Sequence, residues 1–294
     1  MNRILLFGNT GQLGWELHRS LAPLGEVTAL DLPHIDLTRP AMVREIIRAG
    51  HPDLIVNATA YTAVDKAESE PDMARRINAE APGIMAEESD RIGAAFIHYS
   101  TDYVFNGDAS QPYTEADDPD PLSVYGATKL EGEEAVRRAG GTYLILRTSC
   151  VYSLRRRSFV TQVMEWARTR QVLRVATDQV GSPTWCRMLA EATAGLVARL
   201  EGAPGDALRG RSGVFHLAGS GAASRYEWAR LILELDPHRG DHTLRELQPA
   251  LGSDFPSPAR RPRYSALNCQ LFHSTFGLKL PDWRQALRLA MSGD

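Results

Sequence analysis

The feature that most constrains the fold of this chain is a glycine-rich segment that joins a predicted strand to a predicted helix near the N-terminus. Residues 3–7 form a short apolar run, and leucines recur at helical spacing between residues 12 and 24. Between them lies the segment Gly8-Asn-Thr-Gly11-Gln-Leu-Gly14. Glycines here let the backbone turn tightly and approach a pyrophosphate, while the start of the helix supplies amide donors. The segment predicts a dinucleotide-binding loop, although glycines alone also suit a structural turn.

An acidic residue comes directly after the second predicted strand, residues 26–30. Asp31 lies about twenty residues after Gly11, where a carboxylate can accept hydrogen bonds from the adenosine ribose. Asp36 competes for this role, and capping of the helix that begins at Pro40 is an alternative explanation for an acid here.

The choice between NADH and NADPH depends on the residues after Asp31. These are Leu-Pro-His-Ile-Asp-Leu, without an arginine where the 2′-phosphate of NADPH is met most easily. The sequence therefore favours NADH over NADPH, although Arg39 or His34 could reverse this preference.

Strands and helices alternate through the first half of the chain. Predicted helices over residues 40–49 and 72–92 alternate with predicted strands over 53–56 and 94–99. This alternation predicts an α/β fold built on a Rossmann-type doubly wound parallel sheet. Ligands bind outside the carboxyl ends of the strands of such sheets. The small residues after one strand (Ala58, Thr59, Ala60) suit a cofactor, although they are common in any loop, and the hydroxyls and carboxylate after the next (Ser100, Thr101, Asp102) suit a substrate carbonyl.

Tyr125 and Lys129 stand four residues apart in a segment that its downstream sequence predicts to be helical. On a helix this spacing puts the phenol and the ammonium on one face, about one turn apart. An ammonium nearby favours the phenolate, so we expect Lys129 to lower the pKa of Tyr125 from roughly 10 toward neutrality and to make Tyr125 a general acid. Alone the pair is a weak signal, since many solvated helices carry it.

Three motifs in this order and spacing resemble the extended short-chain dehydrogenases/reductases: Gly8-x-x-Gly11-x-x-Gly14, Tyr99-Ser-Thr-Asp-Tyr-Val-Phe105 and Tyr125-Gly-Ala-Thr-Lys129. Within that superfamily, finer segments are similar to the dTDP-4-dehydrorhamnose reductase family: Gly8-Asn-Thr-Gly-Gln-Leu-Gly14, Ala63-Val-Asp-Lys-Ala-Glu68, Asp178-Gln-Val-Gly-Ser-Pro-Thr184 and Pro258-Ala-Arg-Arg-Pro262. The similarity runs from residue 1 to about 288, which is nearly the whole chain.

The resemblance implies reduction of the C4 ketone of dTDP-4-dehydro-L-rhamnose by NADH or NADPH. It makes Tyr125 the proton donor to O4, Lys129 the residue that lowers the tyrosine pKa and binds the nicotinamide ribose, and Thr101 the hydrogen-bond donor to the carbonyl. The implied cofactor-binding residues are Gly8, Asn9, Gly11, Gln12, Leu13, Asp31, Asp36, Leu37, Ala58, Thr59, Ala60, Thr62, Tyr125 and Lys129. The implied substrate-binding residues are Val64, Thr101, Asp102, Tyr103, Tyr125 and Cys150.

Two places in the second half depart from the family pattern. Cys150 stands where relatives commonly carry a tryptophan near the sugar, and a thiol cannot replace the area of an indole. Arg155, Arg156 and Arg157 stand where relatives tend to carry glycine and polar residues. They are either a clamp for the nucleotide diphosphate or, as we favour, a solvated loop.

Composition and length bound the remaining possibilities. The chain has 294 residues and a net charge of −3, so no basic surplus indicates a nucleic-acid partner. The three cysteines are far apart and the histidines lack ligand spacing, so neither a disulfide framework nor a metal site is expected. With no apolar run long enough for a membrane and no leader, we expect a cytoplasmic protein.

The same resemblance suggests how the chain divides. Residues 1–150 are expected to form mainly the NAD(P)-binding Rossmann domain, and residues 151–294 mainly a smaller α/β substrate domain, with some segments returning to the first sheet. Some relatives are metal-bridged dimers through glutamates, and Glu16 and Glu191 occupy plausible positions. An exposed helical face explains both glutamates more simply, so a homodimer stays open and no bridging metal is expected.

Two alternative functions remain. One is another nucleotide-sugar reductase or epimerase on the same fold, and Cys150 is the reason to consider it. The other is a non-catalytic module like the regulatory subunit of methionine adenosyltransferase, which resembles these reductases. The presence of Thr101, Tyr125 and Lys129 together favours turnover.

Overall fold

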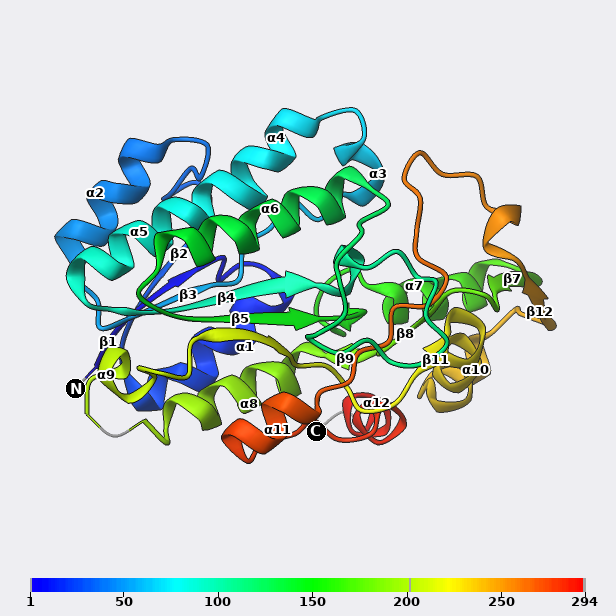
Figure 1. The fold of residues 1–294 in the computed structure, drawn as a ribbon. Coiled ribbons are helices and arrows are strands. Elements are labelled where there is room, and N and C mark those ends of the chain that lie inside the picture. The colour runs from blue at the N-terminus through cyan, green and yellow to red at the C-terminus, as the bar shows by residue number, and fades with distance from the viewer. Residues whose placement is uncertain (1, 201, 293–294) are drawn as a thin grey trace.

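A parallel sheet of six strands forms the centre of the chain (Figure 1). The computed structural model describes residues 2–200 and 202–292. The strand order is β10-β5-β4-β3-β1-β2, and every neighbouring pair is parallel. The strands are β1 (Asn2–Phe7), β2 (Gly25–Leu30), β3 (Leu54–Asn57), β4 (Ala95–Thr101), β5 (Thr142–Thr148) and β10 (Gly213–His216). The predicted doubly wound parallel sheet is therefore confirmed.

Helices cover both faces of this sheet (Figure 1). One face carries α1 (Gln12–Leu21), α8 (Cys186–Val197) and α11 (Gln270–Phe276). The other carries α2 (Pro40–Gly50), α5 (Ala81–Ile92) and α6 (Val124–Ala139). Because side chains alternate along a strand, β1 contributes Ile4 and Leu6 to one apolar core and Leu5 and Phe7 to the other.

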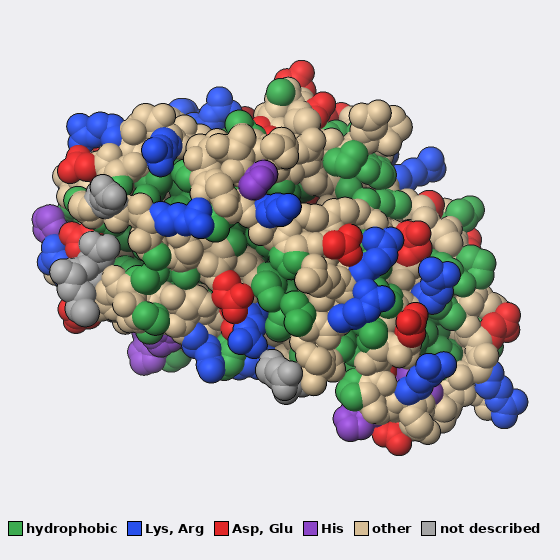
Figure 2. All heavy atoms as spheres, turned by 90° about the horizontal axis from the view of Figure 1, so that it is seen from below, with side chains coloured by type: hydrophobic (Ala, Val, Ile, Leu, Met, Phe, Trp, Pro, Cys, Tyr) green, Lys and Arg blue, Asp and Glu red, His purple; other side chains and the backbone are tan. Residues whose placement is uncertain are grey.

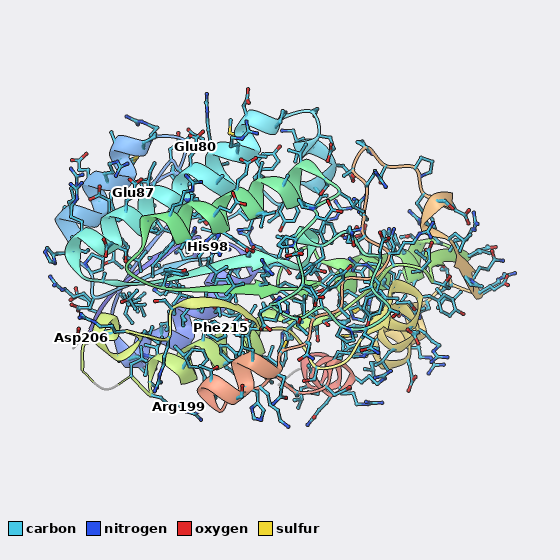
Figure 3. All side chains as sticks on the ribbon, in the orientation of Figure 1. Glu80, Glu87, His98, Arg199, Asp206 and Phe215 are labelled. Atoms are coloured by element: carbon cyan, nitrogen blue, oxygen red, sulfur yellow. The ribbon has the colours of Figure 1, made fainter. Side chains whose placement is uncertain are left out.

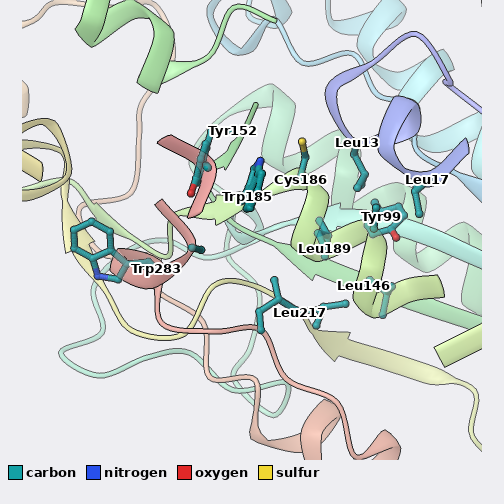
Figure 4. Close-up of a cluster of buried hydrophobic side chains, with 14 of the residues drawn as sticks. Leu13, Leu17, Tyr99, Leu146, Tyr152, Trp185, Cys186, Leu189, Leu217 and Trp283 are labelled. Carbon is teal, nitrogen blue, oxygen red and sulfur yellow. The ribbon is translucent and has the colours of Figure 1, made fainter. Parts of the chain in front are cut away.

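The larger of the two cores shows how the first helix docks. Leu13, Leu17 and Leu21 of α1 are buried, as their spacing predicts. Figure 4 shows Leu13 and Leu17 beside Tyr99 of β4, with Leu189 of α8 close to them. This packing fixes the start of α1 against the end of β1, which is where the glycine-rich loop lies.

The predicted helix over residues 72–92 is interrupted. It consists of α4 (Pro71–Arg75), a π-helical turn (Arg76–Glu80) and α5. A Cβ added to Gly132 of α6 would lie 2.1 Å from the carbonyl oxygen of Asn78 in that turn, so the two helices approach closely there. Sequence periodicity does not reveal a single widened turn, and such turns often occur at functional sites.

Most of the remaining elements lie beyond the carboxyl edge of the sheet (Figure 1). They form three two-stranded ladders and three helices. The ladders are β7 (Val172–Ala176) with β12 (Glu246–Ala250), β6 (Val151–Tyr152) with β9 (Thr184–Trp185), and β8 (Val180–Gly181) with β11 (Ala223–Ser224). The helices are α7 (Phe159–Thr169), α10 (Arg225–Leu235) and α12 (Trp283–Met291). Ser224 and Glu227 form the capping box that the sequence predicts at the start of α10.

The second half of the chain also contributes to the first sheet, since β10 pairs with β5 and α8 packs against α1. The predicted division of the chain at residue 150 stays a prediction. The short helices α3 (Val64–Ala67) and α9 (Pro204–Ala207) complete the fold. In the described part of the chain, no helix combines the length and apolar character that a membrane crossing requires. Acidic and basic side chains are interspersed over the face that α8, α11 and α12 cover (Figure 2).

Candidate active site

A cavity of about 590 Å³ opens at the carboxyl edge of the sheet, where β1, β3, β4 and β5 end. Most residues predicted for the cofactor and the reaction line it: Gly8, Gly11, Gln12, Leu13, Asp31, Ala58, Thr59, Ala60, Thr62, Thr101, Asp102, Tyr125, Lys129 and Cys150. Residues predicted for the site that are not part of this lining are Asn9, Asp36, Leu37, Val64 and Tyr103. The fold thus brings segments from across the first 150 residues to one cavity, which is the candidate active site.

Close backbone approach requires two of the glycines in the loop. Gly8 has φ of 92°, and a Cβ there would lie 3.0 Å from backbone atoms of Ala58 and Thr59. A Cβ on Gly14 would lie 2.0 Å from the carbonyl oxygen of Gly8. After Gly11, α1 begins with no side chain capping its first amides and no acidic residue in its first turn. Free amides and the positive end of a helix dipole at a cavity are the arrangement that binds phosphate.

The two candidate carboxylates have different settings. Asp31 lines the cavity and accepts hydrogen bonds from Thr10 Oγ1 at 2.6 Å and from the backbone N–H of Leu32 at 2.9 Å. Asp36 accepts from both the side chain and the backbone N–H of Thr38, and these hydrogen bonds lower the pKa of Asp36. The structure therefore places Asp31 on the cavity and Asp36 in a turn before α2.

Two asparagines hold the loop that comes after β3. The backbone N–H of Thr59 donates to Asn57 Oδ1 at 3.0 Å, and that of Tyr61 donates to Asn78 Oδ1 at 2.8 Å. Asn78 Nδ2 also donates to Thr128 Oγ1 of α6 at 3.2 Å. The π-helical turn thus ties the small-residue loop on the cavity to the helix that carries Tyr125.

The first turn of α6 positions Tyr125. Ser123 caps the helix, and its Oγ accepts from the backbone N–H of Gly126 at 3.2 Å. A Cβ on Gly126 would lie 2.2 Å from the carbonyl oxygen of Tyr103, so this turn lies directly on the segment after β4. The Tyr103 and Tyr125 rings meet edge to face, with centroids 5.8 Å apart.

The segment Ala63–Glu68, which carried part of the resemblance, connects α6 to a distant part of the chain. Glu68 Oε1 accepts from the backbone N–H of Val124 at 2.9 Å. Asp65 Oδ2 pairs with Arg261 Nη2 at 2.8 Å, and this hydrogen bond is the main cause of the lowered pKa of Asp65. These two carboxylates therefore support the site without lining the cavity.

Lys129 lines the cavity but is almost fully buried. Its Nζ lies 2.7 Å from the carbonyl oxygen of Tyr99 and 3.2 Å from His98 Nε2. Burial lowers the pKa of Lys129 to about 8, with Glu133 acting in the opposite direction. Figure 3 shows His98 between β4 and α6.

The expected lowering of the Tyr125 pKa does not hold in this structure. Burial raises the pKa of Tyr125 above its usual value, and a hydrogen bond with Thr101 only partly opposes this effect. Helical spacing reports the nearby ammonium, whereas the desolvation of the phenol depends on burial in the folded chain. A raised pKa keeps the phenol protonated at neutral pH, which is the state that a proton donor requires.

Asp102 is the centre of a buried hydrogen-bond network. Its Oδ2 accepts from Ser149 Oγ at 2.8 Å and from Ser265 Oγ at 2.5 Å, and its Oδ1 accepts from Thr101 Oγ1 at 3.2 Å. Burial raises the pKa of Asp102, while the two serine hydrogen bonds lower it. The network joins the ends of β4 and β5 to a segment near residue 265.

Cys150 forms the boundary between the cavity and a neighbouring cleft. It has φ of 48°, in the left-handed region, and its Sγ lies 2.7 Å from where a Cβ on Gly181 would be. Burial raises the pKa of this thiol, so it stays neutral. Tyr103 and Arg225 also line this cleft, so Tyr103 shares the cleft with Cys150 and does not line the cavity.

The three consecutive arginines differ in their surroundings. Arg156 and Arg157 line the cavity. The Arg155 guanidinium instead lies over the ring of Trp15, 4.2 Å from its centroid. The phosphate clamp that the sequence left open thus concerns only the last two arginines.

Sequence reasoning missed several residues that build the site. Asn78 and Arg225 stand in ordinary helical sequence and gave no signal. His98 gave one, because it is a polar residue within an otherwise apolar predicted strand, as did Ser149, which comes after a strand that ends at the sheet's carboxyl edge. Across residues 2–200 and 202–292, no group of three or more His, Cys, Asp or Glu side chains is arranged to hold a metal ion.

Comparisons with known proteins agree with one another. A sequence profile described as "RmlD substrate binding domain" matches residues 1–293. A dTDP-4-dehydrorhamnose reductase from Escherichia coli is 43% identical over 290 residues, which cover 97% of this chain and 95% of that protein. A Streptomyces antibioticus protein named probable dTDP-4,6-dihydroxy-2-methyloxan-3-one 4-ketoreductase is 40% identical over 295 residues, which cover 98% of this chain and 94% of that protein.

The fold is similar to solved structures as well. The structure of a dTDP-4-dehydrorhamnose reductase from Bacillus anthracis in complex with NADP matches this chain with a TM-score of 0.89 at 30% identity. The match covers 100% of this chain and 99% of that one.

Proposed function

The chain belongs to the RmlD substrate-binding-domain family, which it matches over residues 1–293, and from this membership we propose that it reduces the C4 ketone of dTDP-4-dehydro-L-rhamnose to dTDP-L-rhamnose with NADH or NADPH. The observation that carries the proposal is the single cavity on which a phosphate-binding loop, Thr101, Tyr125 and Lys129 meet. A non-catalytic module would have no need for these three side chains beside a dinucleotide loop.

The residues present fit a dinucleotide. Gly8 and Gly14 leave no room for a Cβ, which is the close approach that a pyrophosphate loop requires. Gln12 Oε1 is buried without a hydrogen-bond partner among the described residues and belongs to a side chain on the cavity. The amides of residues 11–13 would hold the pyrophosphate, Asp31 the adenosine ribose, and Lys129 the nicotinamide ribose. When bound, the reduced nicotinamide supplies the hydride.

The chain's own residues supply the proton. As hydride reaches C4 of the sugar, O4 becomes an alkoxide and takes the Tyr125 proton. Thr101, next to Tyr125 on the cavity, would turn its hydroxyl from Asp102 to the carbonyl oxygen, donate a hydrogen bond to it and hold O4 near the phenol. The raised pKa of Tyr125 means that the phenol keeps its proton until the alkoxide, a much stronger base, has formed.

The substrate side of the cavity is lined from both halves of the chain. Asp102, Cys150 and Arg156 line it and would contact the sugar or its diphosphate. We extend the proposal to the division of the chain, with residues 1–150 mainly binding the cofactor and residues 151–294 mainly binding the nucleotide sugar. The support is that α7, α10 and the three small ladders all lie beyond the carboxyl edge of the sheet.

The direct experiment generates dTDP-4-dehydro-L-rhamnose in situ and monitors the absorbance of NADH or NADPH. We expect oxidation with at least one cofactor that depends on the sugar, and dTDP-L-rhamnose as the product. No oxidation by folded protein that still binds a cofactor would contradict the proposal.

The Streptomyces antibioticus relative favours a second candidate. Its name describes a 4-ketoreductase for a different dTDP-linked compound, at 40% identity. Cys150 leaves a smaller side chain against the cavity than an aromatic residue would, so another dTDP-linked ketone could fit. Running the same assay with a panel of dTDP-4-keto sugars decides between the two by their kcat/KM values.

A further inference from the structure

Lys129 lies at the end of a buried chain of side chains that begins at the small-residue loop after β3. Thr59, on the cavity, donates to Asn57 of β3. Asn57 contacts His98 of β4, and His98 contacts Lys129 of α6. Asn57 and His98 are fully buried, and Lys129 is 2% exposed. Groups so deeply buried require a consistent assignment of donors and acceptors.

The orientation of the Asn57 amide can be assigned from its partners. Its Oδ1 accepts from the backbone N–H of Thr59 at 3.0 Å and from Thr59 Oγ1. The backbone N–H can only donate, so the oxygen must be on that side and Nδ2 must face His98 Nδ1, 3.1 Å away. Because Nδ2 also can only donate, His98 Nδ1 must accept.

This assignment fixes the tautomer of His98. With Nδ1 accepting, the neutral imidazole carries its proton on Nε2, which faces Lys129 Nζ at 3.2 Å. On its other side, Nζ lies 2.7 Å from the carbonyl oxygen of Tyr99, which can only accept. Every donor then meets an acceptor only if Nζ is an amine that donates to Tyr99 and accepts from His98. If Nζ were an ammonium, one of its N–H groups would point at the imidazole N–H, and neither donor would have an acceptor.

We propose that Asn57 and His98 are positioning residues that direct the Nε2–H of His98 at the lone pair of Lys129 and so set how readily Lys129 gives up its proton. The inference rests on the proposed function for its consequence: once Tyr125 has given its proton to the sugar oxygen, the Lys129 ammonium returns a proton to the tyrosinate, and the amine so formed, which His98 stabilises, is reprotonated from water before the next turnover. Stabilising the amine makes the ammonium a stronger acid toward the tyrosinate. Neither residue lines the cavity.

Other charged groups around Lys129 do not explain this preference. Glu133, on the same helix, favours the ammonium, but it is paired with Arg147 of β5 at 2.7 Å and accepts from Ser100 of β4. The residue of the π-helical turn that contacts α6 is the neutral Asn78, through Thr128, and the residue of β3 that contacts His98 is the neutral Asn57. Asp102, after β4, is engaged by two serines. Burial and the imidazole N–H are what favour the amine.

Asn57→Asp is the informative substitution. A carboxylate can accept from Thr59 with one oxygen and from His98 Nδ1–H with the other, so it satisfies the same neighbours with the opposite tautomer. His98 Nε2 then becomes an acceptor, which favours the Lys129 ammonium. Since reduction consumes the ammonium proton, the alkaline limb of the kcat profile should move up by about one pH unit or more. His216→Gln, which replaces another buried histidine, should leave that limb in place.

The tautomer itself is measured by ¹⁵N NMR of the histidine ring nitrogens in the parent protein, assigned through the backbone. We expect Nε2–H in the parent and Nδ1–H in Asn57→Asp, with the Lys129 Cε resonance titrating at higher pH in the variant. A parent with Nδ1–H, or a switched tautomer without any change in the Lys129 titration, would overturn the proposal. These readouts need no turnover, so they stay decisive if the sugar proves wrong, and the parent measurement stays decisive if the variant fails to fold.

Discussion

The two sides of the cavity are built by different means. On the cofactor side the phosphate-binding loop is a run of consecutive residues, Gly8 to Gly14, and close backbone approach shapes it: Gly14 lies against Gly8, and Gly8 lies against the backbone after β3. The substrate side is made of segments far apart in the sequence: Asp102 reaches Ser149, 47 residues away, and Ser265, 163 residues away. The phosphate-binding loop requires residues without a Cβ, whereas the Asp102 network requires that all of its buried polar side chains are present.

This difference predicts how each side fails. On the cofactor side a single added methyl group collides with fixed backbone, so substitution should weaken ligand binding. On the substrate side a lost acceptor leaves several buried donors without a partner, so substitution should weaken the fold. Substitutions on the two sides separate these outcomes, from the largest expected effect to the smallest.

Asp102→Ala should have the largest effect on stability. It removes the acceptor shared by Ser149, Ser265 and Thr101, and each buried donor left unsatisfied costs about 1–3 kcal/mol. We expect the free energy of unfolding to fall by about 2–4 kcal/mol in urea titrations. Asp36→Ala, which removes only a local turn contact with Thr38, is the matched control and should cost much less. An equal loss in the free energy of unfolding in the two variants would contradict the proposed contrast.

Glu88 of α5 tests the contrast in the half of the chain that binds the cofactor. Its pKa is lowered, whereas the pKa of Asp102 is raised. Hydrogen bonds from Arg48 lower the pKa of Glu88 from 4.5 to about 2. A carboxylate with a depressed pKa contributes stability that is fully present above about pH 4.5 and is lost as the pH falls toward 2. After a discount for the partly exposed arginines, Glu88→Gln should cost about 2 kcal/mol at pH 6.

The cost of Glu88→Gln should shrink as the pH falls from 4.5 to 2, because the parent then loses the same contribution. The pKa of Asp102 is shifted in the other direction, since burial raises it. Thermal unfolding of the parent and the variant across this pH range provides the measurement. A cost that does not change with pH would mean that the ion pairs of Glu88 do not act through its charge.

Gly14→Ala should act on the cofactor rather than on the sugar. Its Cβ would lie 2.0 Å from the carbonyl oxygen of Gly8, so the loop must shift away from the conformation that binds phosphate. We expect the Kd for the nicotinamide cofactor to rise at least about tenfold, as overpacking typically costs about 1–3 kcal/mol. Gly50→Ala, at the end of α2, is the control, because its Cβ would meet only Pro52, at 4.0 Å, and it should leave the Kd unchanged. An unaltered Kd in Gly14→Ala would show that the loop tolerates rearrangement.

The arginine run should give the smallest effect. Arg156 and Arg157 line the cavity and are exposed, so replacing both with alanine should raise the KM of a phosphate-bearing ligand about threefold to tenfold. Arg155→Ala, which loses the contact with Trp15 and a charge near Glu16 but does not change the cavity lining, should leave KM unchanged. If all three substitutions leave KM unchanged, the run is a solvated loop.

The same contrast separates the parts of the molecule that could be predicted from the sequence from those that could not. The Gly8 loop and the parallel sheet were predictable because the determinants are local: apolar periodicity, and glycine where the backbone must approach closely. The pairing of Tyr125 with Lys129 was visible as a helical spacing. Which of Asp31 and Asp36 lies on the cavity was not, because it depends on the course of the turn between them.

The misses share one physical cause. The contact between His98 and Lys129 and the donors around Asp102 join residues that only the folded sheet brings together. Likewise, the direction in which the pKa of Tyr125 shifts depends on burial, which spacing on a helix does not report. The π-helical turn at Asn78 lies where Gly132 approaches closely, a contact across two helices.

The central claim, that Tyr125 delivers the proton in a ketone reduction at this cavity, is tested most directly by Tyr125→Phe. The change removes only the hydroxyl, so the cofactor Kd and the KM of dTDP-4-dehydro-L-rhamnose should stay near those of the parent. We predict that kcat falls at least ~100-fold, as expected for the loss of a positioned proton donor. A folded variant that binds both ligands and still oxidises the cofactor at the parent's rate would contradict the account.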